Sequence, residues 1–382
     1  MNTLLKTLLI ILPITTAAYS AEKHNQQGHN HKSHDHDNHK KDNTKSVYGH
    51  LDVAIFTDAL TDVAEDGKYN EAYSHSHLEL GKSLGKNWSI NSNIKLEGGP
   101  DGDSHAHGGS LSPDGDDHGL NDHMLIVEEL KLDYDSEKFS GYIGKFNPVV
   151  GFDYHNFPGM YGYQSVEGYG IKERVGLGGI LKHNVGDLRT YSLNFSTFFA
   201  DTGGLSDSLF FKRGHNSKED SGVANTEDLS SYAVSFGGSY NQNFTYRLGF
   251  ADQAAGISDA TDNTRYSASM MYKHKISNDL GAKFIFERMH IDNLAGEDAH
   301  NRSHTTGGLE FDFNKWNFGA TYTFTDNDAD EADESFNGNV FQSSIGYEIG
   351  LGTSLELGYK SQNKDNKKNE RIGVALKLSR EF

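Results

Sequence analysis

The stretch Trp316-Asn317-Phe318-Gly319-Ala320-Thr321-Tyr322-Thr323-Phe324 alternates apolar side chains with polar or small ones. Successive side chains of a β-strand point to opposite faces, so one face of this strand meets an apolar medium and the other meets water. The same period recurs in residues 47–55, where the odd positions are apolar, and in residues 244–250. These runs predict a succession of strands that are apolar on one face only.

The connections between the runs fall into two classes that alternate along the chain. Short turns rich in Asn, Gly, Asp and Ser, which are turn-forming residues, lie at 85–87, 136–138, 184–187, 241–243, 277–279, 314–315 and 350–352. Long polar segments lie at 58–70, 98–123, 148–170, 200–230, 254–262, 292–303, 325–337 and 362–369. Most other runs sort in the same way, but the face assignment of residues 139–146 is ambiguous. Short turns at one edge and long loops at the other predict an all-β, transmembrane, antiparallel up-and-down β-barrel of about sixteen strands.

Composition excludes several other classes of protein. The 54 acidic and 35 basic residues give a formal charge of -19, which argues against nucleic-acid binding. The absence of cysteine removes disulfide scaffolds, thiolate metal sites and cysteine nucleophiles. A mean hydropathy of -0.66 argues against a helical membrane bundle. A barrel strand faces lipid only at every second residue, which reconciles this polarity with 22 Phe and 19 Tyr.

The chain divides into three segments. Residues 1–21 resemble a secretory signal, with Lys6 ahead of a short apolar core at residues 8–12. A retained membrane anchor is the alternative, which the shortness of that core disfavours. Residues 22–46 are hydrophilic and histidine-rich, and we expect a disordered periplasmic tail. Residues 47–382 form the predicted outer-membrane barrel.

The last strand and one internal motif carry a resemblance to a known family. Ile372, Val374, Leu376 and Leu378 alternate toward the C-terminal Phe382, and residues 144–148 read Gly-Lys-Phe-Asn-Pro before the third long segment. In both features the chain resembles the 16-stranded diffusion porins of Gram-negative outer membranes. The resemblance implies a water-filled channel, a homotrimer, contacts with outer-membrane lipid and lipopolysaccharide, and recognition of Phe382 by the barrel-assembly machinery.

The resemblance also implies that the third long segment folds into the lumen and constricts it. The candidate constriction residues are the loop groups and the basic residues expected opposite them, namely Asp153, His155, Glu167, Lys172, Arg174, Arg247 and Arg265. Charged groups at a constriction select which ions pass. The alternative is that this aromatic, glycine-rich segment packs as a surface cap.

Twenty histidines form clusters with a His-x-His spacing. This step in an extended chain points both imidazoles the same way, and imidazole beside carboxylate suits zinc, nickel or copper. The candidates are His29, His31, His34, His36, His75, His77, His105, His107, His118 and His123. We expect His75 and His77, opposite Asp52 or His50, to form the best ordered pore site. No cofactor is required, and such histidines can equally be pH-sensitive linkers that bind metal weakly.

These patterns favour a passive porin for small hydrophilic solutes and ions, with a divalent metal such as zinc as one candidate solute. The alternative is a surface metal-binding or adhesin-like barrel whose loops carry the function. A TonB-dependent receptor needs a plug domain and about twenty-two strands, for which the chain is too short. An outer-membrane hydrolase is disfavoured because no Ser–His pair stands out by spacing. We therefore predict that the protein is not an enzyme.

Overall fold

The computed structural model describes residues 47–62, 70–98, 118–120, 123–186, 188–259, 261–330, 335–364 and 367–382. The predicted signal segment and histidine-rich tail, residues 1–46, lie outside this range. Among the described residues, no helix is long and apolar enough to cross a membrane.

Eighteen strands are hydrogen-bonded into one sheet, and two of them, β4 (His118–Gly119) and β9 (Leu209–Phe210), span only two residues each. The other sixteen confirm the expected number. They are β1 (Val47–Asp62), β2 (Asn70–Ser83), β3 (Trp88–Gly98), β5 (His123–Asp135), β6 (Phe139–Phe146), β7 (Arg174–Val185), β8 (Arg189–Ala200), β10 (Ser231–Tyr240), β11 (Phe244–Gln253), β12 (Asn263–Lys275), β13 (Leu280–Asp292), β14 (Asn301–Phe313), β15 (Trp316–Asp328), β16 (Phe336–Gly350), β17 (Thr353–Lys364) and β18 (Lys367–Glu381).

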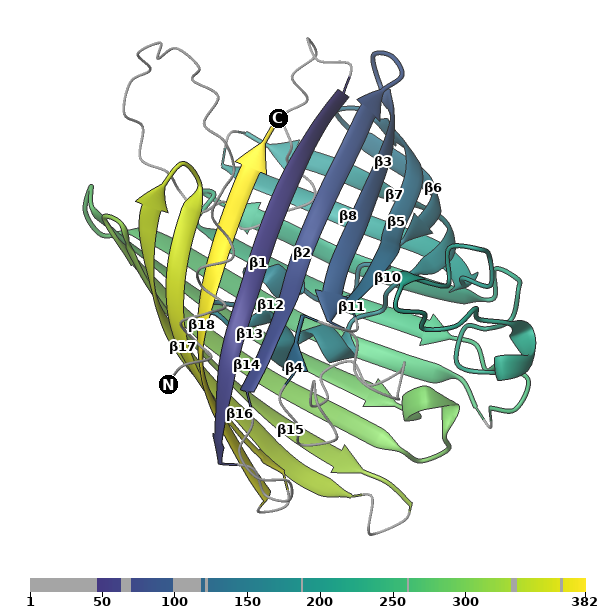
Figure 1. Cartoon of the computed structure of the whole chain (residues 1–382). Helices are drawn as coiled ribbons and strands as arrows, with labels where there is room; N and C mark the ends of the chain where they lie inside the picture. Colours follow the sequence, from purple (N-terminus) through teal and green to yellow (C-terminus); the bar gives the residue numbers. More distant parts are fainter. Residues whose placement is uncertain are drawn as a thin grey trace. The chain divides into compact units, whose positions relative to one another are not determined.

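The sheet closes on itself because β1 pairs antiparallel with β18, from His50 opposite Glu381 to Asp62 opposite Glu370. Each long strand also pairs antiparallel with the next long strand along the chain. Beyond β18, Gly49 and Phe382 exchange two backbone hydrogen bonds of 3.1 Å. Figure 1 shows the yellow β18 beside the purple β1 at this seam. The sixteen long strands therefore form the predicted up-and-down barrel, in which each of them is paired on both sides.

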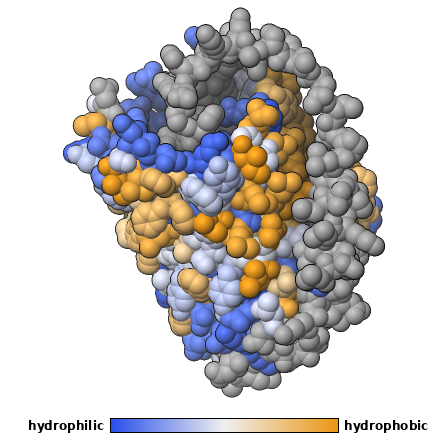
Figure 2. Space-filling view, turned by 60° about the vertical axis from the view of Figure 1, so that its left-hand side comes forward, coloured by the Kyte–Doolittle hydropathy of each residue, from blue (hydrophilic) through white to orange (hydrophobic). Residues whose placement is uncertain are grey.

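The two faces of the wall follow the alternation of the sequence. In β15, Trp316, Phe318 and Tyr322 are exposed on the outside, whereas Thr321 and Thr323 are buried inside. In β6, Phe139 and Ile143 face outward, which resolves the ambiguous run. Figure 2 shows hydrophobic side chains gathered across the strands, with hydrophilic residues above and below them. Such a band is the surface that a lipid bilayer covers.

Large aromatic residues collect at the ends of strands that meet in short turns. Trp88 packs against Tyr134 with ring centroids 5.1 Å apart, and Trp316 packs against Tyr347 at 4.7 Å. Phe139 also lies next to a short turn and is exposed. Aromatic girdles of this kind occupy the interface between hydrocarbon and headgroups in transmembrane barrels.

The third long loop, residues 147–173, lies inside the barrel. It contains the short 3-10 helices η1 (Tyr154–Asn156), η2 (Tyr163–Ser165) and η3 (Glu167–Tyr169), which are seen behind β1 and β2 in Figure 1. Its two ends meet where the backbone nitrogen of Glu173 donates to Asn147 Oδ1 at 2.8 Å. Met160 and Tyr161 are completely buried. The loop is therefore a lumenal element, as the porin resemblance implied, and does not cap the surface.

Candidate functional site: the lumenal loop and a cluster of three histidines

One side of the loop lies on strands β11–β16, which we call the packed wall. The Val150, Phe157 and Tyr169 side chains of the loop are buried in one apolar cluster with Ile285 and Met289 of β13. These wall residues point inward, where the alternation of a porin strand leads one to expect polar groups. They are apolar because the aromatic side of the loop covers them, and burying them there stabilises the loop.

Side chains of the packed wall bind the main chain of the loop. Arg247 Nη1 donates to the carbonyl of Gly151 at 2.9 Å, and Arg265 Nη1 donates to the carbonyl of Tyr169 at 2.7 Å. Glu287 is buried and accepts from the backbone nitrogen of Phe152 at 2.7 Å. Arg247 and Arg265, expected to face acidic loop residues, thus bind carbonyl groups and hold the loop in place.

Glycines let the loop approach this wall closely. A Cβ on Gly319 would lie 2.5 Å from the backbone nitrogen of Gly159, and one on Gly308 would lie 2.7 Å from Pro158 Cδ. Neighbouring Thr321 and Gln342 both donate to the Pro158 carbonyl, at 2.8 and 2.5 Å. Any larger residue at Gly319 would force the loop backbone away.

The opposite side of the loop meets β1, β2, β3 and β18, which we call the charged wall. There the contacts join side chain to side chain. Tyr161 donates through its hydroxyl to Asp58 Oδ1 at 2.7 Å, and Arg371 Nη1 lies 3.4 Å from Asp58 and 3.2 Å from Glu71. Asp58, Glu71 and Arg371 are nearly or fully buried. Their mutual pairing offsets the cost of removing three charges from water.

Glu167 is the centre of a second ionic group at the charged wall. It pairs with Lys172 at 2.6 Å and with Lys95 of β3, which also contacts Glu97 at 2.5 Å. Burial alone would raise the pKa of the Glu167 carboxyl, but the two ammonium groups outweigh burial and hold that pKa well below its usual value. Glu167 and Lys172 therefore pair with each other. Lys172, however, lies in the loop itself and not on the barrel wall, where the cation was expected. Lys95 is the wall cation that sequence reasoning did not single out.

Arg174, the other expected wall partner of the loop, begins β7 and points to a different neighbour. Its Nη2 donates to Gln253 Oε1 at 3.2 Å. The adjacent Glu173 joins Arg213 of the fourth long loop at 2.8 Å and Lys145 of β6 at 2.8 Å. Burial opposes ionisation of Glu173, but hydrogen bonds and charge from Arg213 and then Lys145 lower its pKa to about 2.

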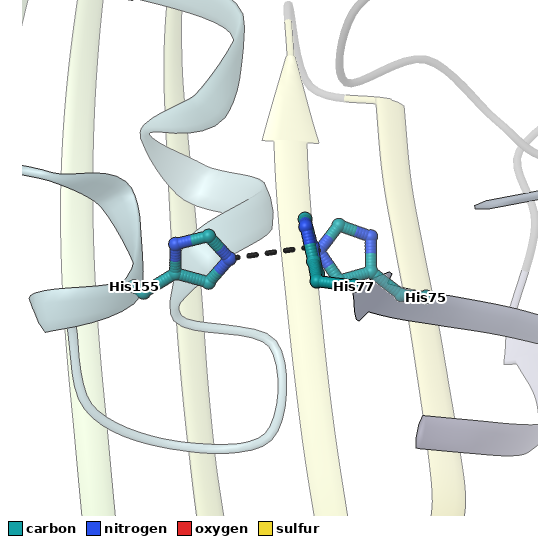
Figure 3. A group of neighbouring side chains, drawn as sticks. All are labelled: His75, His77 and His155. Carbon is teal, nitrogen blue, oxygen red and sulfur yellow. Dashed lines mark hydrogen bonds between the residues drawn. The ribbon is translucent and has the colours of Figure 1, made fainter. Parts of the chain in front are cut away.

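Three imidazoles meet where the loop touches β2. His75 and His77 are both buried and point inward from β2, as their spacing predicts. His155 extends toward them from η1 in the loop (Figure 3). His77 Nε2 lies 3.1 Å from His75 Nε2 and 3.4 Å from His155 Nε2. Asp52 of β1 lies directly opposite His77 in the strand register. This is one of the two neighbours, Asp52 or His50, that the sequence predicts for the histidine pair.

Neighbouring groups hold the three rings. His155 Nδ1 lies 2.8 Å from Asp153 Oδ1, and the backbone nitrogen of His155 donates to the same oxygen at 2.9 Å. His75 stacks on Tyr163 with ring centroids 4.1 Å apart, and its Nδ1 lies 3.8 Å from Glu97. Asp153 and His155, predicted as constriction residues, are thus brought to the predicted metal residues of β2.

The remaining predicted metal residues do not join this group. His123 Nε2 accepts a hydrogen bond of 2.9 Å from the backbone nitrogen of Ser74. His118 lies in β4, which pairs in parallel with β2 at Glu71, and its side chain is outside the described part. His29, His31, His34, His36, His105 and His107 lie outside the described residues.

Comparisons with known proteins agree with the fold. OprB of Pseudomonas putida, at high pH, superimposes with a TM-score of 0.60 at 11% identity, covering 88% of this chain and 95% of that one. The outer membrane channel DcaP of Acinetobacter baumannii gives 0.52 at 11% identity, covering 87% and 96%. A loop-deletion mutant of OmpT, an outer membrane protein of Vibrio cholerae, gives 0.51 at 9%, covering 88% and 100%. The chain has the fold of outer-membrane porin barrels. No protein-family model and no curated sequence matches it.

Proposed function

We propose that this protein is an outer-membrane channel through which small hydrophilic solutes and ions diffuse passively. The observation that carries the proposal is the third loop, which lies inside a closed sixteen-stranded barrel and joins charged groups of opposite walls. Lys95, Glu97, Glu167 and Lys172 then belong to the narrowed part of the path, where fixed charges influence which ions pass. The similarity to DcaP, described as an outer membrane channel, supports this function.

Planar-bilayer recording tests the proposal directly. Purified full-length protein should insert with discrete, ohmic current steps. A variant in which a short Gly-Ser link replaces residues 150–170 should give larger steps, because the loop that narrows the barrel is gone. The approach of Asn147 to Glu173 makes such a link short. A wild-type barrel that inserts but carries no current contradicts the channel, even if the loop-deleted variant conducts.

The alternative is a surface metal-binding or adhesin-like barrel, in which the loops carry the function and the lumen stays sealed. The buried packing of the loop against β13 is what favours it. The same recordings separate the two functions, since a lumen sealed by the loop carries no current in the wild type and conducts only when the loop is deleted.

A Ser–His–Asp contact favours an enzymatic function by its geometry, and we infer that this contact is not catalytic. Ser303 Oγ lies 2.8 Å from His290 Nδ1, and His290 Nε2 lies 2.8 Å from Asp292 at the long-loop ends of β13 and β14. Asp292 also accepts from Thr264, which places it in an ordinary polar chain of the wall. Purified protein and Ser303→Ala should show the same background hydrolysis of a nitrophenyl ester. Activity that Ser303→Ala abolishes would contradict this inference.

Several partners follow from the same proposal. The outward apolar face and its aromatic residues support contact with outer-membrane lipid and lipopolysaccharide. Phe382 pairs with Gly49 at the barrel seam and leaves half its surface exposed, which supports its recognition by the barrel-assembly machinery. A homotrimer stays a prediction from the porin resemblance, and native mass spectrometry of the detergent-solubilised protein tests it.

A further inference from the structure

We propose that His75, His77 and His155 form a binding site for one divalent transition-metal ion of the zinc, nickel and copper class. The expected effect of the ion on the channel current rests on the proposed channel function, because the site joins the wall to the lumenal loop. The metal site itself does not rest on that function, because its chemistry follows from the three side chains alone.

The separations of the ring nitrogens suit a common ion. The three candidate ligand atoms all lie within 4.8 Å of one another, and two of the Nε2–Nε2 distances are 3.1 and 3.4 Å. Three imidazoles at tetrahedral positions, with metal–nitrogen bonds of about 2.0–2.1 Å, have nitrogens about 3.3 Å apart. A shift of the His155 ring toward His75 would complete that geometry. A fourth position would remain for water or a solute, as in zinc sites with three histidines.

Protonation of the cluster also fits a metal. Asp153 Oδ1 lies 2.8 Å from His155 Nδ1, an arrangement that suits a proton on Nδ1 and a Nε2 lone pair directed at the other two rings. A carboxylate behind a metal-binding histidine fixes the tautomer and the ring orientation. His77 lacks such a supporting acceptor, because its buried Nδ1 has no hydrogen-bond partner among the described residues. Two neighbouring Nε2 atoms at 3.1 Å need either a shared proton or a cation between them.

The surrounding charge tolerates an added cation. Glu97 and Asp153 lie beside the outer nitrogens of His75 and His155. The nearby Lys95 is fully engaged by Glu97 and Glu167 on β3 and in the loop. Nitrogen ligands backed by carboxylates select borderline transition metals over calcium or magnesium, which prefer all-oxygen shells.

A bound ion would link two elements that otherwise meet only through side-chain contacts. His75 and His77 belong to the rigid wall, whereas His155 belongs to the loop that narrows the lumen. The ion would therefore fasten the loop to β2 and occupy the edge of the ion path. Transition metals should consequently alter the current through the channel, in addition to binding.

Cobalt binding tests the site itself, because tetrahedral Co²⁺ absorbs visible light much more strongly than octahedral Co²⁺ in solution. Full-length protein in detergent is titrated with Co²⁺ alone, and then with Zn²⁺ to displace it. Every variant keeps the tail and the other histidines, so any cobalt bound there contributes equally to all spectra. The site is therefore measured by the difference in absorption and affinity between variants. His155→Gln should weaken the absorbing site at least about 100-fold, and Asp153→Asn should weaken it about 10–100-fold through ring orientation.

The matched control is His304→Gln, because His304 also faces the lumen, hydrogen-bonds Thr325 and packs against the Tyr169 ring of the loop, with ring centroids 4.7 Å apart. It should leave the cobalt spectrum and affinity unchanged. Heat-modifiable migration in gels checks that each variant is a folded barrel. If His155→Gln disturbs the loop, the double variant of His75→Ala and His77→Ala tests the same site from the wall. Wild-type absorption that survives both sets of substitutions overturns the metal site.

Single-channel recording with micromolar Zn²⁺ then separates this inference from the channel proposal. The wild-type current should change reversibly on adding Zn²⁺ and recover with a chelator, whereas His155→Gln should not respond. Absence of any current removes the channel function but leaves the cobalt result intact. A conducting wild type whose cobalt spectrum equals that of His155→Gln keeps the channel and overturns the metal site.

Discussion

The packed wall and the charged wall hold the same loop through different kinds of contact. On the packed wall, Arg247, Glu287 and Gln342 bind main-chain groups of the loop, and Gly319 lets the backbone approach. On the charged wall, Tyr161 and Glu167 are held by the side chains of β1 and β3. The Glu287 carboxylate can titrate, but the arginine, amide and close-packing contacts of the packed wall do not do so near neutral pH. The charged wall is therefore the main side at which protons, metal ions and permeating ions can act on the loop.

The largest effect should come from removing the buried cation of the charged wall. Arg371→Met leaves Asp58 and Glu71 buried without it, and breaking such a group costs about 3–5 kcal/mol in the free energy of unfolding. Urea unfolding in lipid vesicles measures this. Arg288→Met is the control, because Arg288 is exposed and bonds only Thr305 among the described contacts. Equal midpoints for the two variants would show that the buried group contributes nothing.

A pH-dependent loss should follow at Glu173, where charges fasten the end of the loop. Its pKa is lowered to about 2, so its stabilising contribution is complete above the unfolded value near 4.5 and disappears as the pH falls through about 2. Glu173→Gln should remove at most about 3 kcal/mol at neutral pH. It should also flatten the pH dependence of the unfolding free energy between these values. Glu227→Gln, an exposed carboxylate in the fourth long loop, should leave that dependence unchanged.

Crowding the packed wall should have a smaller effect on stability and a clear effect on current. Gly319→Val places side-chain atoms against the Gly159 backbone and should cost about 1–3 kcal/mol as the loop moves away. The displaced loop should change the single-channel conductance. Gly307→Val is the matched control, because a Cβ at Gly307 meets nothing within 4 Å. The same conductance in both variants would mean that the loop does not depend on this contact.

The smallest structural effect is expected at Lys172, which shares Glu167 with Lys95. Lys172→Met leaves Glu167 paired, so the unfolding midpoint should move little. Ion selectivity should nevertheless shift toward cations, because one positive charge leaves the narrowed part of the path. Reversal potentials in a salt gradient measure this shift. Lys212→Met, an exposed residue of the fourth long loop, should leave the potential unchanged. An unchanged potential in Lys172→Met would place the ion path elsewhere.

Much of the barrel was predictable from short-range pattern, and much of the site was not. The alternation in residues 316–324 predicts which side of β15 meets lipid, and the structure confirms it. The inward apolar residues Ile285 and Met289 break the expected polar lumen, because the loop covers them. The close approach at Gly319 left no signal in the sequence that separates it from a turn or strand glycine.

The order of residues alone predicts the strand faces, the alternation of short and long connections, and the placement of His75 and His77 on one side of a strand. These features depend on a period of two residues, which is local. The folded barrel is what brings His155 to this pair and Lys95 to Glu167. His155 lies 78 positions from His77 in the chain. Such contacts depend on strand register and on the path of the loop across the barrel, which no local pattern encodes.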